Sequence, residues 1–290
     1  MKTMPPTDDA QAAAALWNGH SGHAWVDTQA VLDAMFQPFE DRLVEAVSTH
    51  GAQRVLDVGC GTGSTTLAIS RQIGAAGQCT GVDISEPMLR LAQARAEREA
   101  ASVRFIRADA QTHAFEPATF DMIVSRLGVM FFNDPVAAFA NLRLAASEGA
   151  ALWFIAWRSG TDNPFMTTAE RAAAPLLSNL PQRQPGAPGQ FAFADRERVA
   201  NILAASGWTD IDIQPADFAC TLPERELVPY LSRFGPVGLA LQAVDAQTRV
   251  RVVDAMRAAS EPYVHGAEVR FSAACWIARA RATRLEAAHA

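Results

Sequence analysis

The stretch VLDVGCGTGSTT (55–66) places three glycines within five residues, directly after a short apolar run. The run predicts a buried strand over 54–58, and STTLAISRQI (64–73) predicts a helix after the loop. In a strand–loop–helix unit, backbone N–H groups and the helix N-terminus face a ligand, and glycines permit close approach. The stretch therefore predicts a ligand site in its loop.

Strand-like and helix-like runs alternate along the chain on both sides of this loop. The predicted strands lie at 54–58, 78–83, 103–109, 120–126, 149–157, 209–222 and 267–282. Such alternation favours a mainly parallel sheet with helices on both faces. We expect a Rossmann-like, doubly wound α/β fold of seven strands, the last one antiparallel, with helical lid insertions.

Three interpretations of the glycine loop compete. A dinucleotide site needs G-x-G-x-x-G, and here the third glycine comes one residue early. A phosphate-binding P-loop needs a lysine after the glycines, which the chain lacks, and a tight structural turn needs no ligand at all. Asp57, just before the loop, would repel a pyrophosphate but suits an amine or a sulfonium, and Asp83 at the end of the second strand suits ribose hydroxyls.

Together these motifs resemble those of the class I S-adenosylmethionine-dependent methyltransferases, over about residues 50–160. VLDVGCGTG matches that family's first motif, GVDIS its acidic second-strand motif, and RADAQTHAFEPATFDMIVSRLGVMFF the stretch over its third and fourth strands. The upstream LWNGHSGHAWVDTQ (16–29) is similar to a segment of bacterial small-molecule methyltransferases, including relatives of quinone-biosynthesis C-methyltransferases. The resemblance implies S-adenosylmethionine as the cofactor and methyl transfer as the reaction.

The resemblance also implies roles for particular residues. Asp57, Gly59, Cys60, Gly61 and Thr62 would surround the methionine part and the sulfonium. Asp83 would bind the ribose, and the adenine would lie against Ile84 and Met88. The remaining implied cofactor contacts are Asp109, Ala110, Ser125, Arg126 and, from the N-terminal helices, Trp25 and Gln29, with Trp17 as a further lid candidate. Trp17 and Trp25 could equally be packing residues, and Arg126 could pair with Asp57, Asp83 or Asp109.

These expectations divide the chain into four parts. Residues 1–50 form an N-terminal helical lid, and residues 51–158 form the cofactor-binding core. Residues 159–194, rich in Pro, Gly and Gln, form a lid or substrate loop. Residues 195–290 complete the sheet and carry a helical insertion at about 224–266.

The sequence says less about the methyl acceptor than about the cofactor. SRLGVMFF (125–132) stands where methyltransferases of base or amide nitrogens often carry an Asn/Asp-Pro-Pro-aromatic run, so we expect a small organic acceptor methylated at oxygen or carbon. Val129, Met130, Phe131 and Phe132 would form an apolar wall, although each could instead be sheet core. Further aromatic candidates in the insertions are Phe165, Phe191, Phe193, Tyr230 and Phe234.

A general base is not identifiable from the sequence. His20, His23, His113 and Arg126 are the catalytic candidates, and His265 is a more remote one. A lone histidine is more often a surface residue than a catalyst.

Composition limits the classes of partner. A net charge of −6 disfavours a nucleic-acid surface, which relies on clustered Lys and Arg. The four cysteines form no C-x-x-C pair, so we expect no metal site, no disulfide framework and a cytoplasmic location. No signal peptide is expected, and the longest apolar run, at 150–157, is too short to span a membrane. A homodimer is a family-level expectation.

Two other functions stay open at this point. One is a cofactor-binding subunit without catalysis, because the motifs demand no catalytic base. The other is a nicotinamide-dependent oxidoreductase, which the glycine spacing and Asp57 oppose.

Overall fold

The computed structural model describes residues 8–178, 180–181, 183–184 and 186–283. Its strands are β1 Arg54–Val58, β2 Gln78–Asp83, β3 Val103–Arg107, β4 Phe120–Arg126, β5 Ala146–Trp157, β6 Thr209–Pro223, β7 Val264–His265 and β8 Glu268–Arg281. Its α-helices are α1 Asp8–Asn18, α2 His20–Asp27, α3 Gln29–Met35, α4 Gln37–His50, α5 Ser64–Ile73, α6 Glu86–Arg98, α7 Pro135–Ala145, α8 Pro164–Ala173, α9 Arg196–Ala205, α10 Leu227–Arg233, α11 Gly235–Ala240 and α12 Ala246–Ala259. Three short 3-10 helices are η1 Val129–Phe131, η2 Glu224–Glu226 and η3 Glu261–Tyr263.

One sheet runs through the molecule in the order β3-β2-β1-β4-β5-β8-β6, and the two-residue β7 pairs with β8. The first five strands are parallel, whereas β8 is antiparallel to both β5 and β6. The predicted Rossmann-like, mainly parallel sheet is confirmed, with β7 as a short addition. Strand order reverses between β1 and β4, and ligands of open α/β sheets bind at the carboxyl ends of strands at such a switch point.

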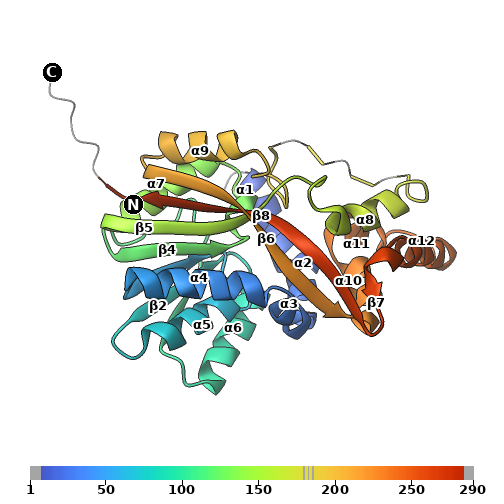
Figure 1. Ribbon diagram of the computed structural model, residues 1–290, viewed down its shortest axis with the longest axis horizontal. Coiled ribbons are helices and arrows are strands. Elements are labelled where there is room, and N and C mark those ends of the chain that lie inside the picture. The colour runs from blue at the N-terminus through green and yellow to red at the C-terminus, as the bar shows by residue number, and fades with distance from the viewer. Residues whose placement is uncertain (1–7, 179, 182, 185, 284–290) are drawn as a thin grey trace.

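Helices cover both faces of the sheet, with α4, α5 and α6 on one side and α7 and α9 on the other (Figure 1). The buried residues Phe39, Leu43 and Val47 of α4 are four apart, so one stripe of the helix faces the core. On the opposite face, the ring of Phe139 in α7 lies 5.5 Å from that of Phe154 in β5. The sheet is thereby a packed scaffold for the loops at its ends. No helix within the described ranges has the length and apolar character to cross a membrane.

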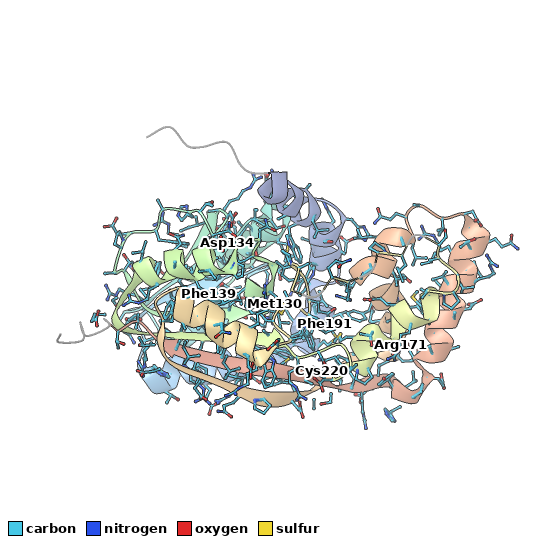
Figure 2. All side chains as sticks on the ribbon, turned by 90° about the horizontal axis from the view of Figure 1, so that it is seen from above. Met130, Asp134, Phe139, Arg171, Phe191 and Cys220 are labelled. Carbon is cyan, nitrogen blue, oxygen red and sulfur yellow. The ribbon has the colours of Figure 1, made fainter. Side chains whose placement is uncertain are left out.

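The paired strands β6 and β8 extend well beyond the parallel strands. β5 pairs with β8 only from Ala151–Arg281 to Trp157–Cys275, so residues 268–274 project past it. The helices α8, α10, α11 and α12 gather at this projecting end (Figure 1). In the view from above, Arg171 of α8 lies at this end, far from Phe139 of α7 (Figure 2). The 159–194 segment, expected as a loop or lid, thus contains the helix α8.

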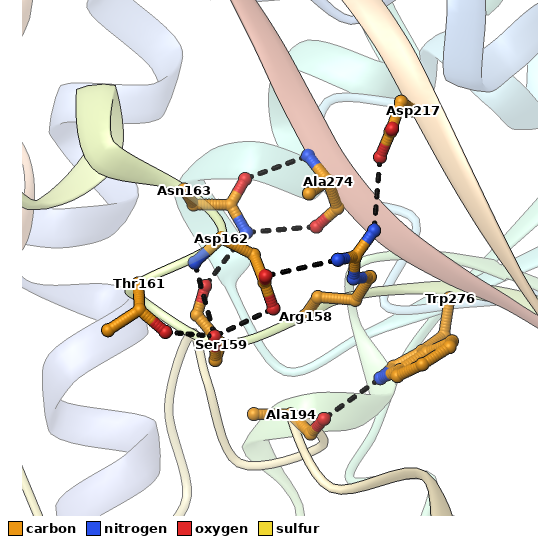
Figure 3. A network of polar contacts seen from close by, with 9 residues as sticks. All are labelled: Arg158, Ser159, Thr161, Asp162, Asn163, Ala194, Asp217, Ala274 and Trp276. Carbon is orange, nitrogen blue, oxygen red and sulfur yellow. Dashed lines mark hydrogen bonds and ion pairs between the residues drawn. The ribbon is translucent and has the colours of Figure 1, made fainter.

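Polar contacts attach the start of the 159–194 segment to the sheet (Figure 3). The buried side-chain amide of Asn163 donates to the carbonyl of Ala274 at 2.9 Å and accepts from its N–H at 2.8 Å. Arg158 pairs with Asp162 at 3.0 Å and with Asp217 of β6 at 3.2 Å. The segment therefore leaves β5 in a defined direction, toward the helices of the insertion.

Candidate active site

The glycine loop follows β1 in a conformation that depends on its glycines. Gly59, Gly61 and Gly63 all have positive φ, of 68°, 54° and 84°. A Cβ atom on Gly59 would lie 2.7 Å from the Cα of Gly128, which follows β4. Only glycine fits at this close approach, so the β1 and β4 loops lie back to back at the switch point. Gly128 is a site residue that the sequence analysis missed.

Asp57 is a buried acid at the carboxyl end of β1, with 1% of its surface exposed. Its Oδ2 accepts a hydrogen bond of 2.7 Å from the Thr66 hydroxyl, whereas its Oδ1 is buried without a partner. Burial raises the pKa of this carboxyl to about 6, although the Thr66 bond and the nearby charge of Arg126 act in the opposite direction. A buried carboxylate oxygen without a donor favours a cationic ligand.

Asp83 ends β2 and is tied to the backbone on either side of the site. Its Oδ2 accepts from the Gly61 N–H and its Oδ1 from the Ser85 N–H, both at 2.8 Å. Burial raises its pKa, and these two backbone hydrogen bonds oppose the rise. Each carboxylate oxygen keeps a free lone pair, so the fixed carboxylate can accept hydroxyl donors from a ligand.

Arg126 is the last residue of β4 and lies at the switch point. Its Nη1 is buried without a hydrogen-bond partner, and within the described residues no carboxylate lies at ion-pair distance from it. The alternative interpretation of Arg126, an ion pair with Asp57, Asp83 or Asp109, is therefore not seen among the described residues. Leu127, which follows, has a positive φ of 66°, an unusual conformation for a side-chain-bearing residue and typical of functional loops.

A cavity of about 460 Å³ opens between these loops and the helical additions. Ligand pockets commonly measure about 300–1,000 Å³. The structure brings most of the sequence-predicted residues to its lining: Trp17, Trp25, Asp57, Gly59, Cys60, Gly61, Thr62, Asp83, Ile84, Met88, Asp109, Ala110, Arg126, Met130, Phe131, Phe132, Tyr230 and Phe234. Residues as far apart in the sequence as Trp17 and Phe234 thus share one cavity.

Other predicted residues lie outside the lining. Gln29 donates to Asp33, and Ser125 is buried, with its hydroxyl donating to the Val58 carbonyl at 2.7 Å. No histidine of the described residues lines the cavity: the rings of His20 and His23 contact backbone carbonyls, and that of His113 packs against Phe115. The remaining predicted residues that stay outside are Val129, Phe165, Phe191, Phe193 and His265.

The N-terminal helices form one wall of the cavity and are tied to the β2 loop. The Ser85 hydroxyl, at the start of α6, donates to the carbonyl of Trp17 at 2.6 Å instead of capping its own helix. The Asn18 amide oxygen accepts from the Glu86 N–H at 2.8 Å and so satisfies a free donor at the start of α6. The Trp17 ring then meets Phe131 edge-on at 4.9 Å. α1 is thereby held over the cavity beside Asp83.

A second attachment joins α3 to the glycine loop through α6. Arg95 of α6 forms an ion pair of 2.8 Å with Asp33 of α3. The same guanidinium donates to the Thr62 carbonyl at 2.8 Å. Gln29, which donates to Asp33, adjoins this bridge and does not line the cavity itself.

Five aromatic side chains line the far part of the cavity in a continuous chain of ring contacts, which we call the aromatic wall: Trp25, Phe36, Trp157, Tyr230 and Phe234. Successive ring centroids are 5.3 Å apart for Tyr230–Phe234, 6.0 Å for Phe234–Trp25, 6.4 Å for Trp25–Phe36 and 6.1 Å for Phe36–Trp157. The sequence analysis missed Phe36 and Trp157, which carry only the apolar signal of core residues.

The aromatic wall adjoins the switch point. Arg126 of β4 pairs in register with Ile155 of β5, and Trp157 lies two residues further along the same strand. The backbone N–H of Trp157 also donates to the Met130 sulfur at 3.4 Å. The cavity therefore has one polar part, with three acids, and one aromatic part, in direct succession.

Comparisons with known proteins identify the family of the chain. A family model described as a methyltransferase domain matches residues 55–149. The chain is 33% identical over 208 residues to nocamycin O-methyltransferase of Saccharothrix syringae, covering 66% of this chain and 71% of that protein. It is 31% identical over 153 residues to aklanonic acid methyltransferase of a Streptomyces species, covering 51% and 69%. A demethylmenaquinone methyltransferase of Staphylococcus saprophyticus is 21% identical over 181 residues, covering 60% and 77%.

Among solved structures, the YcgJ protein of Bacillus subtilis superposes with a TM-score of 0.56 and 15% identity, covering 85% of this chain and 98% of that one. A likeness at this identity supports the fold, while the sequence relatives support the family. The chain belongs to the class I S-adenosylmethionine-dependent methyltransferases and is an enzyme of that family with S-adenosylmethionine as its cofactor.

Proposed function

We propose that this methyltransferase transfers a methyl group to an oxygen or a carbon of a small, flat and largely apolar organic acceptor. The aromatic wall carries this proposal, because it lines the cavity next to the cofactor loops. Flat apolar ligands bind against aromatic faces through buried area and ring stacking. The names of the relatives, which include nocamycin and aklanonic acid enzymes, support a small-molecule acceptor.

The orphaned atoms of the site fit the methionine end of the cofactor. The Oδ1 of Asp57 and the Nη1 of Arg126 are both buried and without partners, and they carry opposite charges. A bound zwitterion, with one ammonium and one carboxylate, would satisfy both atoms, and such charge-assisted hydrogen bonds are strong. We assign the ammonium to Asp57 and the carboxylate to Arg126.

The nucleoside end would be held by the β2 and β3 loops. Asp83 keeps lone pairs for the two ribose hydroxyls, while its backbone bonds fix its orientation. Ile84 and Met88 would lie against the adenine. Asp109, whose Oδ1 accepts from the Gln111 N–H at 2.9 Å, and Ala110 would recognise the adenine edge.

The bound cofactor supplies a methyl group already activated on a sulfonium. The chain's own task is to align the acceptor with that methyl carbon and to exclude water. Trp17 and Trp25, held by the N-terminal helices, would cover the reacting groups. Ser125 would act as a positioning residue, because its hydroxyl holds the Val58 carbonyl and accepts from the Gly128 N–H at 3.2 Å. We assign no catalytic role to His20, His23 or His113.

Two further expectations remain proposals. All four cysteines are free and buried, which supports a reducing cytoplasmic location. A homodimer is a prediction for analytical ultracentrifugation.

The proposed function is tested by binding and by turnover. Titration calorimetry with S-adenosylhomocysteine should show a single site in the wild type and at least tenfold weaker binding in Asp83→Ala, because hydrogen bonds to a charged group contribute about 1.5–3 kcal/mol. Asp195→Asn, at the cap of α9 and outside the cavity lining, is the matched control. Labelled S-adenosylmethionine should then methylate members of a panel of phenols, quinones and aromatic carboxylates. Exclusive transfer to amine acceptors would overturn the proposal.

A further inference from the structure

The two parts of the cavity differ in the ionisable side chains that line them. The polar part carries three acids, Asp57, Asp83 and Asp109, together with Arg126. In the part that contains the aromatic wall, the ionisable lining residues are Arg183, Tyr230 and Arg233. Arginine is always protonated in proteins and tyrosine is neutral at physiological pH. This part of the cavity therefore offers hydrogen-bond donors and positive charge to a ligand.

Tyr230 and Arg233 lie three residues apart on α10, a spacing that places two side chains on the same helix face. Both line the cavity, so a phenolic hydroxyl and a guanidinium face it from one helix. The Tyr230 hydroxyl donates to the sulfur of Met166 at 3.4 Å, which is a weak acceptor. Burial raises the pKa of this hydroxyl, so it keeps its proton. A ligand oxygen would be a better acceptor than the thioether.

Arg233 carries a positive charge that no carboxylate of the described residues neutralises within ion-pair distance. Arg183, in contrast, forms an ion pair with Glu170 and lies over the ring of Phe191 at 4.7 Å. Glu170 lies near this rim, 3.9 Å from the position of a Cβ atom on the lining residue Gly235, and it is already paired with Arg183. The edge of the cavity beside the aromatic wall is therefore left with net positive charge.

We propose that the acceptor is a flat aromatic oxyanion, such as a carboxylate, phenolate or enolate, with an oxygen bound by the Tyr230 hydroxyl and its charge facing the Arg233 guanidinium. This inference rests on the proposed function and names the class of its acceptor. Such an acceptor has lost its proton before it binds. When its oxygen, or the carbon of an enolate, attacks, its own electron pair forms the new bond to the methyl carbon, and the electron pair of the methyl–sulfur bond stays with sulfur, so the chain has no proton to remove.

Binding to the cofactor-product complex tests the inference without turnover. The probes are 1-hydroxy-2-naphthoate and its neutral carboxamide, titrated into protein saturated with S-adenosylhomocysteine. The wild type should bind the carboxylate about fivefold more tightly, the upper range for a partly exposed charge pair. Arg233→Gln should remove this preference, Arg233→Glu should reverse it, and Arg233→Lys should keep most of it. Arg225→Gln, in η2 outside the cavity lining, is the control and should leave the preference unchanged.

Tyr230→Phe should weaken both probes by about threefold to tenfold, because the carbonyl oxygen of either probe loses the same donor. A merely structural role for Arg233, at the C-terminus of α10, would lower thermal stability and leave the ratio of the two affinities intact. Equal binding of the two probes by the wild type, failure of both to bind, or an unchanged ratio in Arg233→Gln would overturn the inference. Loss of S-adenosylhomocysteine binding by the wild type would instead overturn the proposed function.

Discussion

Replacing Asp57 by asparagine should stabilise the ligand-free protein and lower its affinity for the cofactor. The carboxyl has a pKa of about 6 in the folded protein, against an ordinary value of 3.8, because burial disfavours its charged form. Folding therefore takes up protons between these two pH values. The ionised Asp57 therefore lowers the free energy of unfolding. This loss grows as pH rises from about 4 to 6 and is fully present above pH 6.

The expected size of the effect follows from this difference in pKa. At neutral pH it corresponds to about 3 kcal/mol of stability, which an uncharged side chain would recover. Asparagine can keep the Thr66 hydrogen bond, but its amide nitrogen would replace the partnerless Oδ1 and lose about 1–2 kcal/mol in turn. We expect a net gain of about 1–2 kcal/mol in the free energy of unfolding at pH 7.5 and a loss of the gain near pH 4.

Urea denaturation followed by circular dichroism measures the gain, at pH 7.5 and at pH 4.5. Asp134→Asn is the matched control, because Asp134 caps α7 and asparagine caps a helix equally well. Calorimetry with S-adenosylhomocysteine measures the second effect, and we expect Asp57→Asn to bind it at least tenfold more weakly because the ammonium loses a charged acceptor. A variant that is less stable than the wild type at pH 7.5, or equally affected at both pH values, would refute the reasoning.

Three further predictions concern the same scaffold. In the wild type, affinity for S-adenosylhomocysteine should fall about tenfold between pH 7.5 and pH 5, because Asp57, with a pKa of about 6, must ionise to bind an ammonium; a flat calorimetric profile would contradict this. Gly59→Ala should lower the unfolding free energy by more than about 3 kcal/mol and abolish cofactor binding, since its Cβ would meet Gly128, whereas Gly51→Ala, with similar φ but open space, should cost about 1 kcal/mol in urea unfolding. Asn163→Ala should cost about 2–3 kcal/mol in the same assay, because it leaves the buried Ala274 N–H of β8 without a partner and removes one of two hydrogen bonds to the Ala274 carbonyl, which keeps the Arg158 N–H; a loss below 1 kcal/mol would argue against this anchor.

The cofactor half of the site could be predicted from the sequence because its parts are local. Asp57, the glycines and Asp83 lie within 27 positions of one another, each at the end of a strand whose pattern is visible. Parallel pairing of β1 with β2 brings these strand ends to one edge of the sheet without any further information.

The acceptor half was decided by tertiary structure. The aromatic wall draws its rings from α2, the end of α3, the end of β5 and the α10–α11 junction, and nothing in the apolar pattern separates Phe36 or Trp157 from ordinary core residues. Ser85 shows the same limit: its position predicts a helix cap, yet its hydroxyl binds Trp17, which lies 68 residues away. The sequence alone determined which cofactor is held, because that information lies in short motifs, whereas the surroundings of the acceptor depend on packing between distant segments.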